Sequence, residues 1–584
     1  MIKYCNLLIF KSIIYFFLQE IKVFVRHFRY LIVFFKYVSF FKYIIYRKKD
    51  YRILRNKTQR RALEKNYHFW KRSIKKSTEK DKILITSLIE VVDYSIGNAI
   101  VGKILTKILN KNSIGLIKEL HFKTEIFLRS FGIDEVHYIP EGNFFSRLKY
   151  FFKSIELINN IKNTDALLKL KYQNVDIGIA VYDHHIRFTG IGSCELINPK
   201  MIYFLSKALL VQNFSKKLFK SNTIKEVVQT EQQFIPSMII FQNALLNKCR
   251  VFARIGLNNE VSVLIKNGLE EKFTELYTFS QELLKLVYKN YDNNMSEKID
   301  YLLKERFKGN ITYSCDHDIA ENMEHKFFDM GDLINNYTKE ELCKKFNWNV
   351  DKPIVVIFST DLTDGVFKFN WKIFKDNLTG LKKTLDIIKE IKDINWLIKS
   401  HPNDVKLEVV TSTEEEVLNL SKKYQNIRLF PKKFGCSPLP KIISAAITMS
   451  GSAGYEYPAL GVPTIICTGA FYSGHGFNYE AHTINEYEKM LKKADKLIPL
   501  SIEQISKAKT FIYTHTILSK VISSLIPNQN RNVLGGNNFE NNEYWRNFEM
   551  LIENYKFDKD EFYKNFNIQL EKYDRHTIKY QLLK

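Results

Sequence analysis

Short apolar segments alternate with helical stretches in the second half of the chain, and this alternation restricts the fold more than any other sequence feature. Five such segments are bounded by polar or glycine-rich turns: Pro353–Phe358, Asn395–Lys399, Ile427–Phe430, Ala446–Met449 and Pro463–Cys467. Strands that alternate with helices build a parallel sheet covered by helices on its faces. This half of the chain is therefore predicted to be a Rossmann-like α/β domain.

Residues 77–330 carry the same alternation in a less regular form. Lys82–Thr86 and Ser113–Ile117 are predicted strands on either side of a helix over Ile96–Leu109, and Val175–Val181 is predicted to be a further buried strand. Strand, helix and strand again indicate a parallel sheet. The fold class predicted for the whole chain is α/β with two Rossmann-like domains.

The 584 residues divide into four predicted parts. Residues 1–76 are a basic amphipathic segment, residues 77–330 an N-terminal domain with a helical connector, residues 331–540 a C-terminal domain, and residues 541–584 a helical tail. The composition, 45% apolar and 26% charged, is that of a globular protein. The seven cysteines form no CxxC pairs, so we predict neither a disulfide framework nor a zinc site and expect a reducing cytosol.

The positive charge is concentrated at the N-terminal end. Residues 1–76 contain 20 Lys and Arg against three acidic residues, a net charge of +17 out of +25 for the whole chain. This asymmetry argues against a nucleic-acid-binding surface spread over the molecule. Between Met1 and Tyr46, basic residues interrupt nine Phe and six Tyr, so no run reaches the ~20 apolar residues that span a bilayer.

On a helix, five of these basic residues fall within an arc of about 80°, opposite a broad apolar surface. They are Lys11, Lys22, Arg26, Arg29 and Lys36, and the cluster Arg47, Lys48, Lys49, Arg52, Arg55, Lys57, Arg60 and Arg61 follows them. We predict a peripheral anchor on an anionic membrane surface, whose deletion leaves a folded, soluble core. The alternative is a helical domain whose aromatic residues form an ordinary core.

Ionisable residues crowd the predicted end of the strand Val175–Val181. Asp183 is the first candidate for a catalytic carboxylate and His185 the second, because ligands bind at the carboxyl ends of parallel strands. Glu231, which follows a later predicted strand, is a weaker alternative for the same role. The competing interpretation is a polar loop that Asp183 caps and in which Arg187 forms a salt bridge.

The second domain contains a His-Pro turn. His401 and Pro402 follow the predicted strand Asn395–Lys399. Proline fixes the turn and removes a competing N–H donor, so the imidazole can point at a phosphate beyond the strand end. Lys399 is a further candidate for contact with that phosphate. The alternative is a turn residue bonded only to backbone.

Two more loops follow predicted strands of this domain. The first has small residues that expose backbone N–H groups where a helix begins, as anion sites require; its candidates are Ser450, Gly451, Ser452 and Gly454. Glu456, in the first turn of that helix, either binds ribose hydroxyls or only complements the helix dipole. The second loop, Gly469–Phe477, is rich in glycine and aromatic residues, and Tyr472 is its candidate for the wall of a sugar or nucleotide pocket.

No metal site is predicted. Asp361 and Asp364 are the only local approximation to the paired acidic residues that hold a divalent cation at a strand end.

Two motifs carry a resemblance to a known family. The segments IKSHPN at residues 398–403 and GSAGYEYPALGVPTIICTGAFYSGHGF at residues 451–477 resemble the capsule polysaccharide biosynthesis family, which includes bacterial β-Kdo transferases. The resemblance covers about residues 350–480. It implies two facing Rossmann-like domains of the GT-B kind, with the nucleotide held mainly by the C-terminal domain and the acceptor by the N-terminal one.

The resemblance also implies roles for residues. His401 and Pro402 match the His-Pro motif that similar CMP-sugar transferases place at the nucleotide phosphate, and Ser450 with Ser452 resembles their paired-hydroxyl motif. Asp364-Gly365 faintly resembles their acidic-acidic-Gly motif, but it is incomplete and lies in the other domain. His475 stands where the family's aromatic loop commonly has Trp.

The function that these residues and the resemblance imply is glycosyl transfer in capsule or surface polysaccharide synthesis. An acidic sugar, Kdo-like or nonulosonate, is expected to pass from a CMP-activated donor to a glycan or glycolipid, without a further cofactor. The enzyme is expected to be cytoplasmic and peripheral at the inner face of the cytoplasmic membrane. The alternatives are a CDP-polyol phosphotransferase, a UDP-sugar 2-epimerase, and a non-catalytic capsule assembly or export protein.

Overall fold

The chain forms two compact units. The computed structural model describes residues 2–39, 51–89, 91–255, 259–308, 334–367, 373–406, 409–527 and 539–583. Unit 1 comprises Met1–His185, Glu195–Lys272 and Lys520–Ile578, and unit 2 comprises Ile186–Cys194, Phe273–Ser519 and Lys579–Lys584. These bounds differ from the predicted domains, because both the basic N-terminal segment and most of the C-terminal tail belong to unit 1.

Unit 1 is built on a mixed sheet. In the described part of the chain this sheet has seven strands in the order β13-β6-β5-β4-β1-β2-β3. They are β1 (Lys82–Ser87), β2 (Asn112–Lys118), β3 (Val136–Ile139), β4 (Ile224–Val228), β5 (Arg250–Ile255), β6 (Glu260–Lys266) and β13 (Val521–Ile522). β1 to β5 pair in parallel, whereas β6 and β13 add antiparallel edges. The chain order reverses between β1 and β4, which is the switch point of this sheet.

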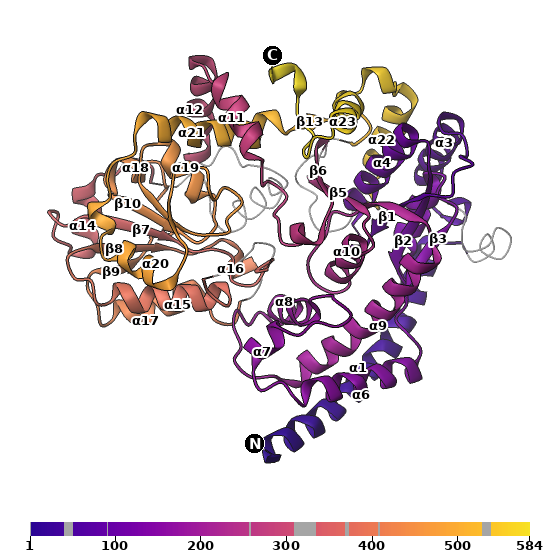
Figure 1. The fold of residues 1–584 in the computed structure, drawn as a ribbon, viewed down its shortest axis with the longest axis horizontal. Helices are drawn as coiled ribbons and strands as arrows, with labels where there is room; N and C mark the ends of the chain where they lie inside the picture. Colours follow the sequence, from indigo (N-terminus) through magenta and orange to yellow (C-terminus); the bar gives the residue numbers. More distant parts are fainter. Residues whose placement is uncertain are drawn as a thin grey trace. The chain divides into compact units, whose positions relative to one another are not determined.

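The helices of unit 1 come from both ends of the sequence. They are α1 (Ile2–Tyr37), α3 (Lys57–Ser73), α4 (Val92–Leu109), α5 (Phe122–Ser130), α6 (Phe144–Ile158), α7 (Thr164–Leu168), α8 (Ile177–Thr189, which runs into unit 2), α9 (Pro199–Ser221), α10 (Ser237–Leu246), α22 (Asn542–Asn554) and α23 (Glu561–Lys572). α3 packs against α22, as Figure 1 shows. Trp70 of α3 and Trp545 of α22 are buried in one core with Phe34 of α1. The N-terminal segment is therefore part of the unit 1 core.

The predicted strand Val175–Val181 is wrong, because the chain there enters helix α8. Gly178 packs so closely on α7 that an added Cβ would lie 1.7 Å from the carbonyl oxygen of Leu167. A short apolar run buried on all sides lacks the polar face that distinguishes a helix from a strand.

Unit 2 has a fully parallel sheet. Its six strands among the described residues follow the order β12-β11-β10-β7-β8-β9. They are β7 (Ile354–Phe358), β8 (Asn395–Lys399), β9 (Ile427–Leu429), β10 (Ala445–Thr448), β11 (Thr464–Cys467) and β12 (Tyr479–Ala481). The five strands predicted for this half of the chain are confirmed, and the predicted α/β class with two parallel-rich sheets is confirmed for the whole molecule.

Helices cover both faces of this sheet. They are α11 (Gln281–Lys289), α12 (Asn293–Phe307), α14 (Lys339–Phe346), α15 (Asn377–Ile388), α16 (Asn403–Lys406), α17 (Thr413–Ser421), α18 (Leu439–Ile442), α19 (Ala453–Ala459), α20 (Ile484–Leu491) and α21 (Ile502–Tyr513). In Figure 1, α15, α17 and α20 lie on one side and α18 and α19 on the other. Along β7, Val355 and Ile357 enter one core while Ile354 and Val356 enter the other. Burial on both faces explains why these strands are continuous apolar runs.

Candidate functional site

The carboxyl edge of the unit 2 sheet gathers the predicted donor residues. The chain order reverses between β7 and β10, and ligands of open α/β sheets bind outside the carboxyl ends of strands at such a switch point. Phe358 of β7 is in register with Lys399 of β8 and Thr448 of β10. Neighbouring strands lie about 4.8 Å apart, so the turns after β8 and β10 begin about 10 Å from each other. We call this region the carboxyl edge of unit 2.

The turn after β8 fixes the tautomer of His401. The backbone N–H of Asn403 donates to Nδ1 of His401 at 3.2 Å, and the N–H of Asp404 donates to its carbonyl at 3.1 Å. Because Nδ1 accepts, the neutral ring carries its proton on Nε2. The half-buried imidazole therefore presents an N–H donor at the end of β8. The backbone bond of the alternative interpretation is present, and it leaves Nε2 as the atom for a ligand.

Asp404 and Lys399 complete this turn. Burial raises the pKa of Asp404, against hydrogen bonds from Thr413 and the electrostatic interaction with His401, which lower it. The Thr413 N–H donates to the Asp404 carboxylate at 3.1 Å, which ties the turn to the start of α17. The ammonium of Lys399 lies 5.7 Å from the centre of the Phe430 ring and is half-exposed.

The acidic residues of the turn after β7 are structural. One carboxylate oxygen of Asp361 accepts from the N–H groups of Thr363 and Asp364 at 3.0 and 2.9 Å, and the other accepts from the amide of Asn403. Asp361 therefore joins the turns after β7 and β8. Asp364 forms an ion pair with Arg187 at 3.1 Å, both within unit 2. Among the described residues no group of three His, Cys, Asp or Glu is arranged to hold a metal ion.

The serine loop after β10 is a tight turn into α19. The N–H of Gly451 donates to Oγ1 of Thr448 at 3.1 Å, and the N–H of Gly454 to the carbonyl of Gly451 at 3.0 Å. Within the described part of the chain, the hydroxyls of Ser450 and Ser452 make no hydrogen bond. Ser452 is half-exposed, whereas Ser450 is buried with 7% exposure, so Ser452 is the more accessible polar group of this loop.

Tyr472 holds the serine loop in place through a hydrogen bond. Its side chain is fully buried, and its hydroxyl donates to the carbonyl of Gly451 at 2.7 Å. A Cβ on Gly454 would lie 2.0 Å from the same hydroxyl, so only glycine permits this contact. The wall of a pocket stays a prediction for Tyr472 that its burial opposes, and in the structure the residue is a positioning group for the serine loop.

Glu456 is engaged within unit 2. Its carboxylate lies 3.2 Å from Nε of Arg306 on α12, and only 8% of the side chain is exposed. This ion pair uses the carboxylate that was assigned to ribose. In the structure, Glu456 links α19 to α12. The ribose contact stays a prediction, and this ion pair opposes it.

The loop after β11 turns through glycines. Gly474 and Gly476 both have φ of 80°, a conformation that disfavours other residues. The ring of His475 stacks on Phe477 at 6.4 Å between centroids, and burial lowers the pKa of His475 to about 4. His475 is therefore neutral near pH 7 and packs as the aromatic residue of this loop.

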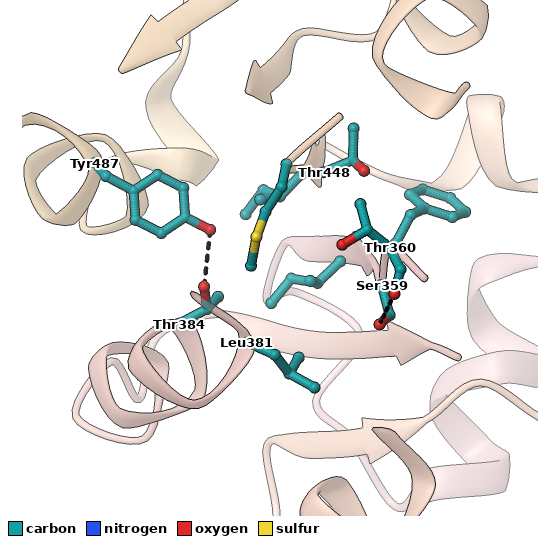
Figure 2. Close-up of a pocket in the computed structure, with 10 residues that line it drawn as sticks. Ser359, Thr360, Leu381, Thr384, Thr448 and Tyr487 are labelled. Atoms are coloured by element: carbon teal, nitrogen blue, oxygen red, sulfur yellow. Dashed lines mark hydrogen bonds between the residues drawn. The ribbon is translucent and has the colours of Figure 1, made fainter. Parts of the chain in front are cut away.

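A small pocket lies between the ends of β7 and β10 and the helices α15 and α20 (Figure 2). Its polar lining includes Ser359, Thr360 and Thr448, and the Thr384 and Tyr487 hydroxyls are 2.9 Å apart at its other side. It has room for about one water molecule and is too small to hold a nucleotide. Ser359 and Thr360 directly follow the strand PIVVIF, and they are not among the site residues predicted from the sequence.

The predicted acceptor residues of unit 1 are buried. Asp183 is 0% and His185 1% exposed, both on α8. The amide nitrogen of Asn198 lies 3.1 Å from Nε2 of His185, and burial lowers the pKa of His185 to about 4. Neither side chain lines an open surface, because the predicted strand end is the interior of a helix. The alternative prediction is a polar loop in which Arg187 forms a salt bridge. The structure has helix α8 there, and Arg187 forms its ion pair with Asp364.

Glu231, the weaker sequence candidate, lies in the better position. It is half-buried in the turn after β4, at the switch point of the unit 1 sheet, and its carboxylate accepts from the N–H of Gln233 at 2.9 Å. Gly97 at the start of α4 is approached closely by a side chain. A Cβ on Gly97 would lie 2.2 Å from the guanidinium carbon of Arg254, which is fully buried at the end of β5.

No protein-family model matches the sequence, and no curated protein matches it. Similar solved structures include KpsC, a β-Kdo 2,4 transferase of Thermosulfurimonas dismutans, with 12% identity over 50% of this chain and 85% of that chain and a TM-score of 0.30. A putative UDP-N-acetylglucosamine 2-epimerase of Listeria monocytogenes has 12% identity over 75% of this chain and 97% of that chain, at a TM-score of 0.21. At such TM-scores these similarities carry no argument, and the fold class rests on the two sheets.

Proposed function

We propose that the chain is a glycosyltransferase of surface polysaccharide synthesis. It takes an acidic sugar, Kdo-like or nonulosonate, from a CMP-activated donor and transfers it to a glycan or lipid-linked acceptor at the inner face of the cytoplasmic membrane. The observation that carries the proposal is the carboxyl edge of unit 2, where Nε2 of His401 and the hydroxyls of Ser450 and Ser452 follow strands on either side of β7.

The chemistry asks this edge to stabilise a leaving phosphate. An acceptor oxygen attacks the anomeric carbon, the bond from that carbon to the phosphate oxygen breaks, and negative charge develops on CMP. An N–H donor from His401 and hydroxyl donors from the serine loop stabilise that charge most strongly when they are already oriented, as the Asn403 and Tyr472 contacts arrange. Lys399 adds a positive charge at the same strand end.

The acceptor proton requires a base. A carboxylate or neutral imidazole takes it during attack. Glu231 is the candidate that its position in unit 1 favours, whereas Asp183 and His185 remain predictions that their burial opposes.

A nucleotide-dependent thermal shift tests the proposal. CMP is expected to raise the melting temperature more than UMP, CDP or UDP, since a ligand at about 100 times its Kd stabilises a protein by ~2.7 kcal/mol. The combined Ser450→Ala and Ser452→Ala variant should keep the melting temperature of the free protein and lose much of the CMP shift. Ser421→Ala, a serine of unit 2 on α17, serves as the matched control.

Other results favour the other functions. A preference for CDP favours the CDP-polyol phosphotransferase, and a preference for uridine nucleotides favours the UDP-sugar 2-epimerase. Negligible shifts with all four nucleotides, or CMP binding without turnover, favour a non-catalytic capsule assembly or export protein. Each of these outcomes contradicts the proposed transfer from a CMP donor.

A further inference from the structure

Helix α1 exposes an apolar face of unusual size. Twelve large apolar side chains on its described part are between 41% and 75% exposed. Six of them fall within an arc of about 80° at 100° per residue: Phe10, Phe17, Ile21, Phe24, Phe28 and Ile32. Together the twelve side chains, each about half-exposed, present on the order of 1,000 Å² of apolar surface. The largest apolar patch of a typical soluble monomer is ~300–600 Å², so this face calls for a partner.

Another side of α1 is anchored in unit 1. Phe16 is buried and stacks on Phe151 of α6 at 4.6 Å between ring centroids, and Phe34 packs on Phe122 at 5.1 Å. Glu20 of α1 also forms an ion pair with Arg147 of α6. Figure 1 shows α1 running along α6 and α9. These contacts fix the rotation of the helix on unit 1, and this rotation leaves the apolar face exposed.

Neighbouring residues extend and border this face. α6, which contacts α1 through Phe16 and Phe144, adds the 77% exposed Phe145. On α1 itself, the exposed basic residues Lys11, Lys22 and Arg29 lie within an arc of about 20°, roughly 100–120° from the centre of the apolar face. When a helix lies flat with its apolar side in the acyl chains, residues at that angle reach the level of the headgroups.

We infer that this face, with Phe145 of α6 beside it, is the surface by which unit 1 inserts into an anionic lipid bilayer, with α1 lying flat in the interface. No helix in the described ranges is both long and apolar enough to cross a membrane. The charge favours an anionic bilayer over a second copy of the chain as the occupant of this face. Residues 1–76 carry +17, and a second copy would bring the same positive charge to the contact. The inference gives the membrane location in the proposed function a defined surface.

Vesicle sedimentation of the full chain tests the surface. The wild type is expected to bind vesicles of phosphatidylglycerol and phosphatidylcholine at low salt, and phosphatidylcholine alone only weakly. The combined variant Phe17→Gln, Phe24→Gln and Phe28→Gln should bind more than about tenfold more weakly because it removes three inserted rings. Lys11→Gln, Lys22→Gln and Arg29→Gln together should weaken binding about 100-fold, at about fivefold for each charge.

A matched control separates this surface from general apolar exposure. Tyr301, Ile498 and Ile502 of unit 2 are 65%, 75% and 85% exposed, and their combined Gln variant should bind vesicles as the wild type does. Equal binding of the wild type and the Phe variant overturns the inference. So does a wild type that ignores anionic vesicles; sedimentation velocity then shows whether the face holds a second copy. The CMP shift of the Phe variant should be unchanged, so failure of the donor proposal would be seen separately.

Discussion

At the scale of single residues, His401 is the side chain on which the donor chemistry most depends. His401→Ala removes the Nε2–H donor and is expected to lower kcat/KM by about 10- to 150-fold, the equivalent of the ~1.5–3 kcal/mol of a hydrogen bond to a charged group. His401→Gln keeps an N–H donor and should recover part of the loss. Single-turnover rates and CMP affinity measure both effects.

The exposed His482 of unit 2 supplies the control for this prediction, and His482→Ala should behave as the wild type. Near-wild-type turnover in His401→Ala would remove the residue from the mechanism. Glu456→Gln should act differently, because it weakens the ion pair with Arg306 and so lowers the melting temperature. A specific loss of CMP affinity without a change in melting temperature would restore the ribose contact predicted from the sequence.

His185 gives unit 1 a dependence on acid. Its pKa is lowered to about 4 in the folded chain from about 6.5 in the unfolded chain. Between these values the unfolded state binds the extra proton, so stability falls as pH falls from about 6.5 to about 4. Between pH 7 and pH 5, protonation of His185 in the unfolded state lowers the free energy of unfolding by about 2 kcal/mol.

Urea unfolding at the two pH values measures this cost. His185→Gln keeps an acceptor for Asn198 and should reduce the stability lost between pH 7 and pH 5, whereas His68→Gln, at an exposed position, is the control. An equal loss in wild type and His185→Gln would show that the imidazole is not buried in its neutral form.

At the scale of elements, the sequence predicted unit 2 well and unit 1 less well. The strands β7, β8, β10 and β11 are buried on both faces and end in glycine or polar turns, which makes them recognisable. The start of α8 resembles a strand in sequence because its apolar run has no polar face. The partners of Glu456 and Tyr472 lie 150 and 21 residues away in the sequence, so their engagement was invisible before folding.

The N-terminal helices α1 and α3 carry the next prediction. Deleting residues 1–76 removes the buried side chains of Phe34, Leu63 and Trp70, and should leave unit 1 insoluble or without a cooperative melt. The milder Trp70→Ala should cost about 3–5 kcal/mol. Circular dichroism and limited proteolysis follow both variants. A soluble truncated chain that melts at the wild-type temperature would restore the detachable arm expected from the charge pattern.

At the scale of the whole molecule, unit 1 is discontinuous in sequence. The chain leaves it after Lys272 and returns at Lys520, so unit 2 is in large part an insertion. Charge and composition mark the two ends of the chain as distinct segments, yet Arg61 of α3 pairs with Glu549 of α22. The return of the chain to unit 1 depends on complementary surfaces of α3 and α22. These helices lie far apart in the sequence, so no local sequence pattern predicts their contact.

The packing of α3 against α22 orders events during synthesis of the protein. A ribosome releases the residues of unit 2 up to Ser519 before it releases α22 and α23. Most of unit 2 is therefore synthesised before unit 1 is complete. The apolar surface around Trp70 stays uncovered until α22 is made, nearly 500 residues later. Until then the nascent chain carries an open apolar surface, and this is the interval in which it is most prone to aggregation.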